Sequence, residues 1–227
     1  MSFSEDRQQR AGSAETRAAI MEATHRALCK YGYANLSIQK IADEFEMTTA
    51  VLHYHYDTKE NLLAAFLEYL LDNLVDEYTA QFDIESIENP RDRLLVIIDA
   101  LLVVLVGIDD PDRPIERVDD RPPLGGEELS MALLELRAQA GRNEAFRKQF
   151  TINYDYAWDL MVATIEEGIE QEVFREVDPE QVATLLLATM LGGRAYHVSL
   201  THDDVATMVR NALVDLILDD LLIKRKD

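Results

Sequence analysis

Signals that begin α-helices recur along this chain, and each precedes apolar residues at helical spacing. Ser37 and Thr48 both stand before a short helix, with a hydrophobic residue on either side as a staple. The run Asp-Pro-Glu-Gln at 178–181 combines a side-chain cap, a first-turn proline and a Gln at the capping-box position. No convincing strand pattern and no internal repeat is visible. The sequence therefore predicts an all-α fold with about nine helices.

The helix pattern and the composition divide the chain into an arm and two domains. Residues 1–13 are polar and predict a flexible arm, at whose end Ser13 can cap the first helix. Residues 14–74 predict an N-terminal three-helix domain that contains a helix-turn-helix motif at 37–56. Residues 75–227 predict a larger α-helical domain, whose proline-rich, charged segment at 109–126 is a connector.

The charge of the chain is unevenly distributed. The formal net charge is −21, but residues 1–60 hold 7 Lys and Arg against 9 Asp and Glu, a net of −2. The strong acidity thus belongs to the remainder, while the N-terminal part stays close to neutral. Arginines outnumber lysines 16 to 6. This composition is typical of a halophilic protein in a high-salt interior, where salt screens the repulsion between carboxylates.

Nothing in the sequence predicts export or insertion into a membrane. The longest apolar run, Leu94 to Ile108, is interrupted by Asp99 and is shorter than the roughly 20 residues of a membrane span. No basic segment leads into an apolar one at the N-terminus, as it would in a secretory signal. The single cysteine, Cys29, cannot form an internal disulfide and fits a reducing interior as a small core residue. We therefore expect a cytoplasmic protein without membrane contact.

The segment 37–56 has the pattern of a unit that reads double-stranded DNA. Two short helices are joined by a tight turn, and small hydroxyl residues begin the second helix. The major groove, about 12 Å wide, admits one such helix. The spacing predicts that Leu52 turns towards the core while Thr49, His53 and Tyr54 are exposed. Hydroxyl and N–H groups at the two helix starts can bind phosphates.

A series of short motifs runs without a gap from helix one to the start of helix four. It comprises Thr16-Arg17, Ile20, Tyr31-Gly32-Tyr33, Ser37-Ile38, Ile41-Ala42, Met47-Thr48, Tyr54-His55-Tyr56 and Asp57-Thr58-Lys59-Glu60-Asn61-Leu62. In order and spacing, this series resembles the DNA-binding domain of the tetracycline-repressor (TetR/AcrR) family of regulators. Three positions depart from the family pattern: Glu46 replaces a usual turn glycine, His53 a usual aromatic residue and Tyr56 a usual phenylalanine.

The C-terminal part is similar, more loosely, to the ligand-binding domain of the family's betaine-pathway regulators. Phe174-Arg175, followed by Asp178-Pro179 and the final helices, carries this resemblance. It implies that residues 75–227 form a ligand-binding and dimerisation domain.

The resemblance also implies roles for particular residues. Contacts to DNA are implied for Ser37, Gln39, Thr48, Thr49, His53, Tyr54, His55 and Lys59. Candidates for lining a ligand pocket, with core packing as the alternative, are Met131, Tyr154, Trp158, Met161 and Met190. Candidates for the dimer interface, with packing inside one subunit as the alternative, are Ala183, Leu187, Leu191, Gly192 and Gly193.

These features predict a homodimeric transcription regulator rather than an enzyme. A small lipophilic effector bound by the C-terminal domain is expected to release the repressor from a palindromic operator by a population shift. The alternative is a ligand-independent activator or architectural DNA-binding protein, which would have no cavity in its C-terminal domain. No nucleophile elbow, paired metal motif or phosphate loop indicates catalysis, and no cofactor is expected.

Residues of metal-binding type occur, but their spacing does not predict a metal site. His53 and His55 are two apart on a helix and therefore face apart. Glu22 and His25 copy half of a di-iron motif whose other half does not occur. The aspartates at 109–120 lack the order of an EF-hand loop. We predict that these residues lie on the surface or pack in the core, and that no metal is bound.

Overall fold

The computed structural model describes residues 3–45, 48–82, 86–106, 127–202 and 204–222. These residues fold almost entirely into helices. The described part of the chain contains no strand, only an isolated antiparallel bridge between Phe174 and Leu222. When the last helical segments are taken as one continuous helix, nine helices follow one another. The prediction of an all-α fold with about nine helices is confirmed.

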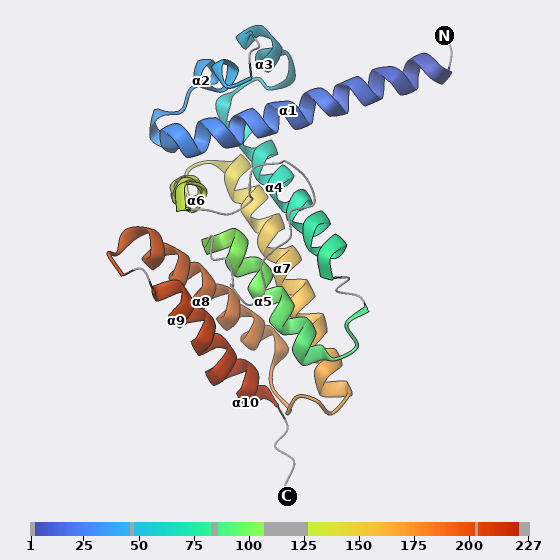
Figure 1. The fold of residues 1–227 in the computed structure, drawn as a ribbon, viewed down its shortest axis with the longest axis vertical. Coiled ribbons are helices and arrows are strands. Elements are labelled where there is room, and N and C mark those ends of the chain that lie inside the picture. Colours follow the sequence, from blue (N-terminus) through green and yellow to red (C-terminus); the bar gives the residue numbers. More distant parts are fainter. Residues whose placement is uncertain (1–2, 46–47, 83–85, 107–126, 203, 223–227) are drawn as a thin grey trace, which may run out of the picture.

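The N-terminal helices form the upper part of the molecule (Figure 1). They are α1 (Phe3–Asn35), α2 (Ile38–Asp43), α3 (Thr49–His55) and α4 (Lys59–Phe82). α1 lies across the top, α2 and α3 lie above its C-terminal half, and α4 runs down into the lower part. Because α4 is continuous, the predicted domain boundary between residues 74 and 75 falls inside a helix.

The start of α1 differs from the prediction. The helix begins at Phe3, so most of the arm predicted at 1–13 is helical, and Ser13 lies inside the helix rather than at its start. Two acidic residues close behind Phe3 favour a helix start through their charge, and Gly12 costs only about 1 kcal/mol within a helix. Near the other end of α1, Gly32 adopts a φ of 65° and interrupts the helix.

The lower part is a bundle of roughly aligned helices (Figure 1). Its members are α5 (Pro90–Val106), α7 (Glu144–Glu170), α8 (Pro179–Ser199) and α9 (Val205–Leu213), continued by a π-helical segment (Val214–Leu218) and α10 (Asp219–Leu221). α6 (Glu127–Gln139) lies between α1 and α8 and packs mainly against α1. It therefore joins the bundle to the upper helices. None of the described helices is long and apolar enough to cross a membrane.

Local hydrogen bonds cap several helix starts, and the one at Asp178 confirms the start predicted at 178–181. Asp178 accepts both the backbone N–H and the side-chain amide of Gln181, at 3.1 and 2.7 Å. Asn89 and Asn143 each accept a backbone N–H from the first turn of α5 and α7, at 2.9 and 3.1 Å. Caps of this kind stabilise a helix by about 1 kcal/mol each. The connector at 109–126 lies outside the described residues.

Two hydrophobic clusters hold the described helices together. The upper cluster surrounds Phe66 of α4, includes residues of α1, α2 and α3, and extends to Leu133 of α6 and Phe146 of α7. The lower cluster surrounds Met161 of α7 and Met190 of α8 and includes residues of α5 and α9. Because α6 and the start of α7 belong to the upper cluster, the helix-turn-helix shares one core with part of the C-terminal region.

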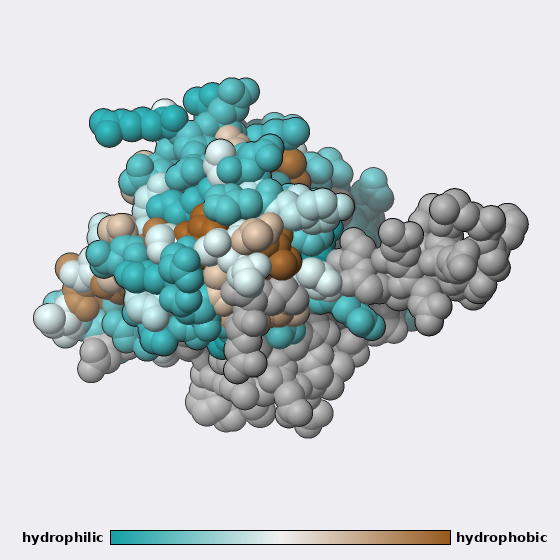
Figure 2. Space-filling view, turned by 90° about the horizontal axis from the view of Figure 1, so that it is seen from above, coloured by the Kyte–Doolittle hydropathy of each residue, from teal (hydrophilic) through white to brown (hydrophobic). Residues whose placement is uncertain are grey.

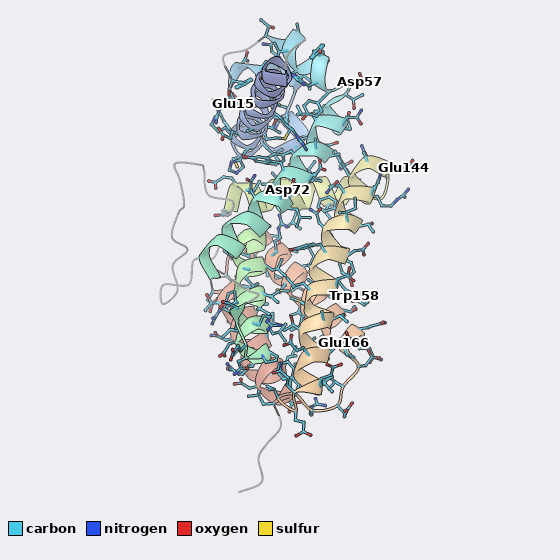
Figure 3. The ribbon with its side chains drawn as sticks, turned by 90° about the vertical axis from the view of Figure 1, so that its right-hand side faces the viewer. Glu15, Asp57, Asp72, Glu144, Trp158 and Glu166 are labelled. Carbon is cyan, nitrogen blue, oxygen red and sulfur yellow. The ribbon has the colours of Figure 1, made fainter. Side chains whose placement is uncertain are left out.

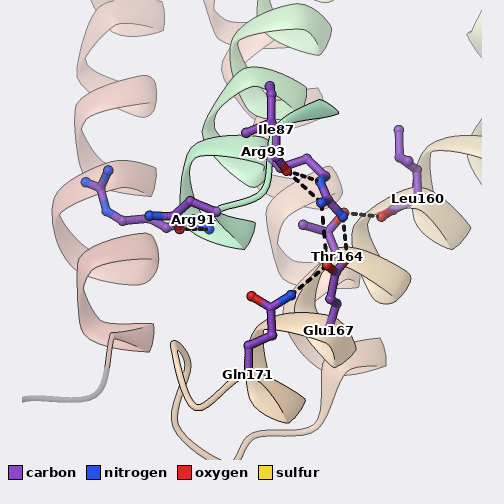
Figure 4. A network of polar contacts seen from close by, with 8 residues as sticks. Ile87, Arg91, Arg93, Leu160, Thr164, Glu167 and Gln171 are labelled. Atoms are coloured by element: carbon purple, nitrogen blue, oxygen red, sulfur yellow. Dashed lines mark hydrogen bonds and ion pairs between the residues drawn. The ribbon is translucent and has the colours of Figure 1, made fainter. Parts of the chain in front are cut away.

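At the lower end of the bundle, Arg93 ties α5 to α7 (Figure 4). Its guanidinium donates to the Ile87 carbonyl at 3.0 and 2.6 Å and pairs with the carboxylate of Glu167. Gln171 donates a further hydrogen bond to Glu167 at 2.8 Å. This partly buried arginine thus has a carboxylate partner, which offsets the cost of removing its charge from water.

Candidate nucleic-acid interface

α3 is held by one buried face and presents its other face to solvent. Leu52 of α3 and Ile41 and Ala42 of α2 are completely buried in the upper cluster. Burial of a leucine or isoleucine side chain stabilises the fold by about 1.5–3 kcal/mol. This packing holds α3 in place, because a helix of seven residues is too short to persist alone. The predicted orientation of Leu52 is confirmed.

The exposed face of α3 carries aromatic and imidazole side chains. Tyr54 is 83% exposed, and His53 and His55 are exposed on either side of it in the sequence. The rings of Tyr54 and His55 meet edge to face, with centroids 5.1 Å apart. Seen from above, the surface over α2 and α3 is mostly hydrophilic (Figure 2). Tyrosine is well suited to such a contact surface, since its ring and hydroxyl offer apolar area and a hydrogen bond together.

The two helix starts differ in their hydrogen bonding. Ser37 Oγ accepts the Lys40 N–H at 3.3 Å, which confirms the predicted cap. Thr48 is the N-cap residue of α3 as predicted, with an extended backbone, but its hydroxyl makes no capping hydrogen bond in the described structure. Its side chain is exposed beside the partly buried Thr49. The turn that contains Glu46 lies outside the described residues.

Gln39 and Lys59, two of the predicted DNA contacts, bond within the chain. The Gln39 amide donates to Asp43 at 2.7 Å. Lys59 Nζ donates to the Leu36 carbonyl at 3.3 Å and lies 4.5 Å from the centroid of the Tyr33 ring. To contact DNA, each of these two side chains must break its hydrogen bond within the chain or share it with the DNA. These partners come from the folded chain, so the sequence alone did not predict them.

The other cations whose side chains are described near α2 and α3 are also bonded within the chain. Arg17 pairs with a glutamate of α4 at 2.8 Å, and Lys30 pairs with Glu44 at 2.7 Å. Arg26 and Lys40 donate to backbone carbonyls at 2.8 and 2.7 Å. α3 itself contains no Lys or Arg. The exposed face of α3 therefore offers neutral hydrogen-bonding groups rather than positive charge.

Two titratable residues of α1 are packing residues. His25 is only 7% exposed, stacks on Phe66 with centroids 6.1 Å apart, and has no hydrogen-bond partner at Nε2 within the described structure. Burial, followed by the charge of Arg26, lowers the pKa of His25. Burial, followed by the charge of Glu128, raises the pKa of Cys29 to about 11. The thiol is therefore protonated at neutral pH and packs against the upper cluster, as predicted for a small core residue.

The predicted ligand-pocket residues do not all lie together. Met161 and Met190 are fully buried in the lower cluster. Trp158 of α7, labelled in Figure 3, packs against that cluster and donates from its indole to a threonine of α8 at 3.2 Å. Met131 and Tyr154 are 41% and 37% exposed, so their side chains reach the surface instead.

The predicted dimer residues divide between two faces of α8. Ala183, Leu187 and Gly193 are buried within their own chain. A Cβ atom at Gly193 would lie 3.0 Å from the methyl groups of a valine in α9. These three residues therefore pack inside one subunit, the alternative that the sequence left open. Leu191 and Gly192 are partly exposed, and a Cβ atom at Gly192 would meet nothing within 4 Å.

Comparisons with known proteins agree for both parts of the chain. Residues 20–66 match the family of bacterial regulatory proteins of the tetR type, and residues 123–222 match the C-terminal domain of BetI-type transcriptional repressors. No curated protein matches the chain by sequence.

Solved structures extend this similarity to the whole fold. A TetR transcription regulator from Haloarcula marismortui is 38% identical, with a TM-score of 0.76, over 92% of this chain and 100% of that one. A putative regulator from Saccharomonospora viridis, solved with choline, is 24% identical, with a TM-score of 0.76, over 93% and 100%. FadR from Bacillus subtilis, solved with stearoyl-CoA, is 17% identical, with a TM-score of 0.68, over 88% and 98%. The last two show the fold alone. Together with the matched segments, the Haloarcula structure shows that the chain belongs to the TetR family of transcriptional regulators, with a C-terminal domain of the BetI type.

Proposed function

We propose that the protein is a dimeric repressor that binds a palindromic operator through α3 and leaves it when an effector binds the lower helices. The observation that carries this proposal is the position of Tyr54. Its ring is 83% exposed on a short helix whose opposite face is fully buried, so the ring is held outward by the core. The protein is proposed to act in the cytoplasm on double-stranded DNA and to catalyse no reaction.

Base contacts are assigned to the exposed face of α3 and phosphate contacts to its rim. Thr49, His53 and Tyr54 can donate and accept hydrogen bonds at base edges, as side chains of a recognition helix do. Contacts to the DNA backbone are assigned to His55 and Thr48, both of which are exposed. Ser37, Gln39 and Lys59 complete the proposed set of DNA contacts. To reach DNA, each of them exchanges its hydrogen-bond partner within the chain for one on the DNA.

Dimerisation is assigned to the outer faces of α7 and α8. Ile152 and Tyr156 of α7 are 45% and 44% exposed, and Leu185 of α8 is 52% exposed. The hydrogen bond between Trp158 and Thr184 brings these turns of the two helices side by side. On the same outer side of α8, Gly192 allows close approach of a second backbone. A pair of subunits would place two copies of α3 about one DNA turn, roughly 34 Å, apart.

The effector is assigned to the bundle around the lower cluster. Met161 and Met190 supply an apolar interior there, with Trp158 at its edge. The proteins of similar fold were solved with choline, stearoyl-CoA and isovaleryl coenzyme A, so this fold accepts ligands of different charge. An effector that binds the DNA-free conformation more tightly than the DNA-bound one lowers the affinity for the operator. The loss of operator affinity equals the difference between the two effector affinities.

The proposal is tested by selecting binding sites from random duplexes with the purified full-length protein. Inverted repeats bound by two subunits are expected. Non-repeated or unselective DNA in the bound pool would contradict the operator model and favour an architectural protein. An activator would bind the same repeats but raise transcription from a promoter that carries them, whereas the proposed repressor lowers it.

A further inference from the structure

A buried arginine at the junction of α6 and α8 has no carboxylate partner among the residues that the structure describes. Arg194 of α8 is only 3% exposed. One terminal nitrogen donates to the Ser130 carbonyl of α6 at 3.0 Å, while Nε has no hydrogen-bond partner. No ion pair involves this guanidinium within the described residues.

A second arginine adds positive charge at the same junction. Arg137 of α6 is partly buried, and its guanidinium lies over the Phe150 ring, 5.2 Å from the centroid, without an ion pair in the described structure. Burial lowers the pKa of Arg137. Burial, followed by the charge of Arg137, lowers the pKa of Arg194 to about 9, which leaves it charged at neutral pH. Two cations therefore repel each other here, and no carboxylate of the described helices pairs with either of them.

An imidazole on the same side of α8 also has an unused polar atom. His197 follows Arg194 by three residues, so the two lie on neighbouring turns of one helix face. Its Nδ1 is buried and has no hydrogen-bond partner within the described residues. Buried polar atoms without a hydrogen-bond partner are rare in folded proteins, and two of them three residues apart on one helix indicate a site that awaits a partner.

Elsewhere in the bundle, partly buried arginines do have carboxylate partners. Arg210 of α9 donates to both carboxylate oxygens of Asp99, at 2.7 and 3.0 Å. Arg93 pairs with Glu167 in the same way at the lower end of α5. No carboxylate of the described residues pairs with Arg194, although its side chain is only 3% exposed. A buried charge without a partner is costly, so an exogenous anion is the expected compensation.

We propose that the α6–α8 junction binds an oxyanion, and that the effector of this regulator is an organic acid whose carboxylate or phosphate contacts Arg194 and Arg137. The guanidinium of Arg194 offers its Nε–H and a terminal N–H to such a group, a fork that suits both oxyanions. Met190 lies one turn earlier on the buried side of α8, within the lower cluster, so an apolar tail would extend towards that cluster. This inference rests on the proposed function, and it selects an anionic effector over a cationic one such as choline.

The test uses the full-length protein in thermal-shift and calorimetric titrations at constant ionic strength. The probes are octanoate, inorganic phosphate and choline, added as chloride or potassium salts with potassium chloride as the baseline. The variants are Arg194→Met and Arg137→Gln, and the matched control is Arg142→Gln, which removes an exposed arginine at the end of α6. Comparing octanoate with inorganic phosphate shows whether the site recognises a carboxylate or a phosphate group.

Octanoate or phosphate is expected to raise the wild-type Tm by several degrees with a saturable dose response, while choline leaves it unchanged. Arg194→Met is expected to bind the anion at least tenfold more weakly, Arg137→Gln more weakly than wild type, and Arg142→Gln as wild type does. Without an anion, Arg194→Met should be as stable as wild type or more so, because it removes an uncompensated charge.

The inference is overturned if neither anion binds, if choline binds in their place, or if Arg194→Met binds anions like wild type. A large drop in Tm of Arg194→Met without an anion would also contradict it, because the arginine would then be a structural residue. Operator binding is measured on the same samples. If choline released the protein from its operator, the proposed function would stand, but the proposed anion site would be wrong.

Discussion

Glu135 of α6 accepts a hydrogen bond from the backbone N–H of Tyr33 at 2.6 Å, directly after the point where Gly32 interrupts α1. The same carboxylate lies 3.3 Å from the place where a Cβ atom of residue 32 would be. α6 thus binds the end of α1 next to the helix-turn-helix, and it joins the two parts of the molecule by a charged hydrogen bond as well as by packing.

Removing this carboxylate should loosen the junction. Glu135→Ala leaves the Tyr33 N–H without its acceptor and is expected to lower the free energy of unfolding by about 1–3 kcal/mol. Glu135→Gln keeps an acceptor and should lose less. Urea denaturation measures both values, with the exposed Glu128→Ala on the same helix as the control. Equal stabilities of Glu135→Ala and wild type would show that the bond contributes nothing.

The burial of His25 predicts a loss of stability in mild acid. Its pKa is lowered from the ordinary 6.5, so the unfolded chain binds this proton more readily than the folded one. The contribution that the neutral, buried His25 makes to the free energy of unfolding is complete above pH 6.5. It is lost as the pH falls from that value towards the lower pKa of the folded state. The slope reaches at most about 1.4 kcal/mol per pH unit for one proton.

Urea denaturation between pH 7.5 and 5.5 tests this assignment with His25→Leu. The variant should lose less stability across that range than wild type, while the exposed His53→Leu should follow wild type. The same slope for wild type and His25→Leu would assign the acid sensitivity to another group.

The helix starts at Ser37 and Asp178 were predicted correctly because a cap is a local interaction, whereas the start predicted at Ser13 lies inside α1. Asp178, Asn143 and Ser37 bond to N–H groups only a few residues ahead. The face that a helix buries depends instead on distant partners. Gly192 and Gly193 are adjacent and point about 100° apart, and only the position of α9 decides which of them is covered.

Other features could not be predicted because they depend on tertiary partners. The position of Arg194 between α8 and α6, without a carboxylate partner among the described residues, is visible only once α6 lies against α8. The partners of Lys59 and Gln39 likewise come from the folded arrangement of α1 and α2. The burial of Leu52 and the exposure of His53 and Tyr54 were predicted correctly, whereas Thr49 is partly buried rather than exposed.

The two neighbouring glycines of α8 give a paired test of the proposed dimer. Gly192→Trp should split the dimer and keep the fold, because the side chain would enter open space on the outer face. Gly193→Trp should instead destabilise the subunit, because its Cβ would already lie 3.0 Å from α9. Sedimentation and circular dichroism separate the two effects, with the exposed Gly141→Trp as control. If the Gly192→Trp protein remained a dimer, the dimer interface would have to lie elsewhere on the subunit.

The absence of Lys and Arg from α3 predicts operator binding with a shallow dependence on salt. Each neutralised phosphate contributes about −0.9 to the slope of log K against log salt. Few such contacts are expected, so binding should persist near molar KCl. Ala50→Lys adds a cation on the exposed face and should steepen the slope by about one. A steep collapse of wild-type affinity between about 0.1 and 0.5 M KCl would contradict this expectation.

The most direct test of the account is a fluorescence-anisotropy titration of the selected operator with the Thr49→Ala/Tyr54→Ala double variant. Loss of two base-reading side chains is expected to weaken binding by at least about thirtyfold, since each is worth about 1–3 kcal/mol. Helical content should stay unchanged, and Thr207→Ala/Met208→Ala, a similar double change on the exposed side of α9, should bind like wild type. A Thr49→Ala/Tyr54→Ala protein that binds the operator within about twofold of wild type would show that α3 does not read the DNA.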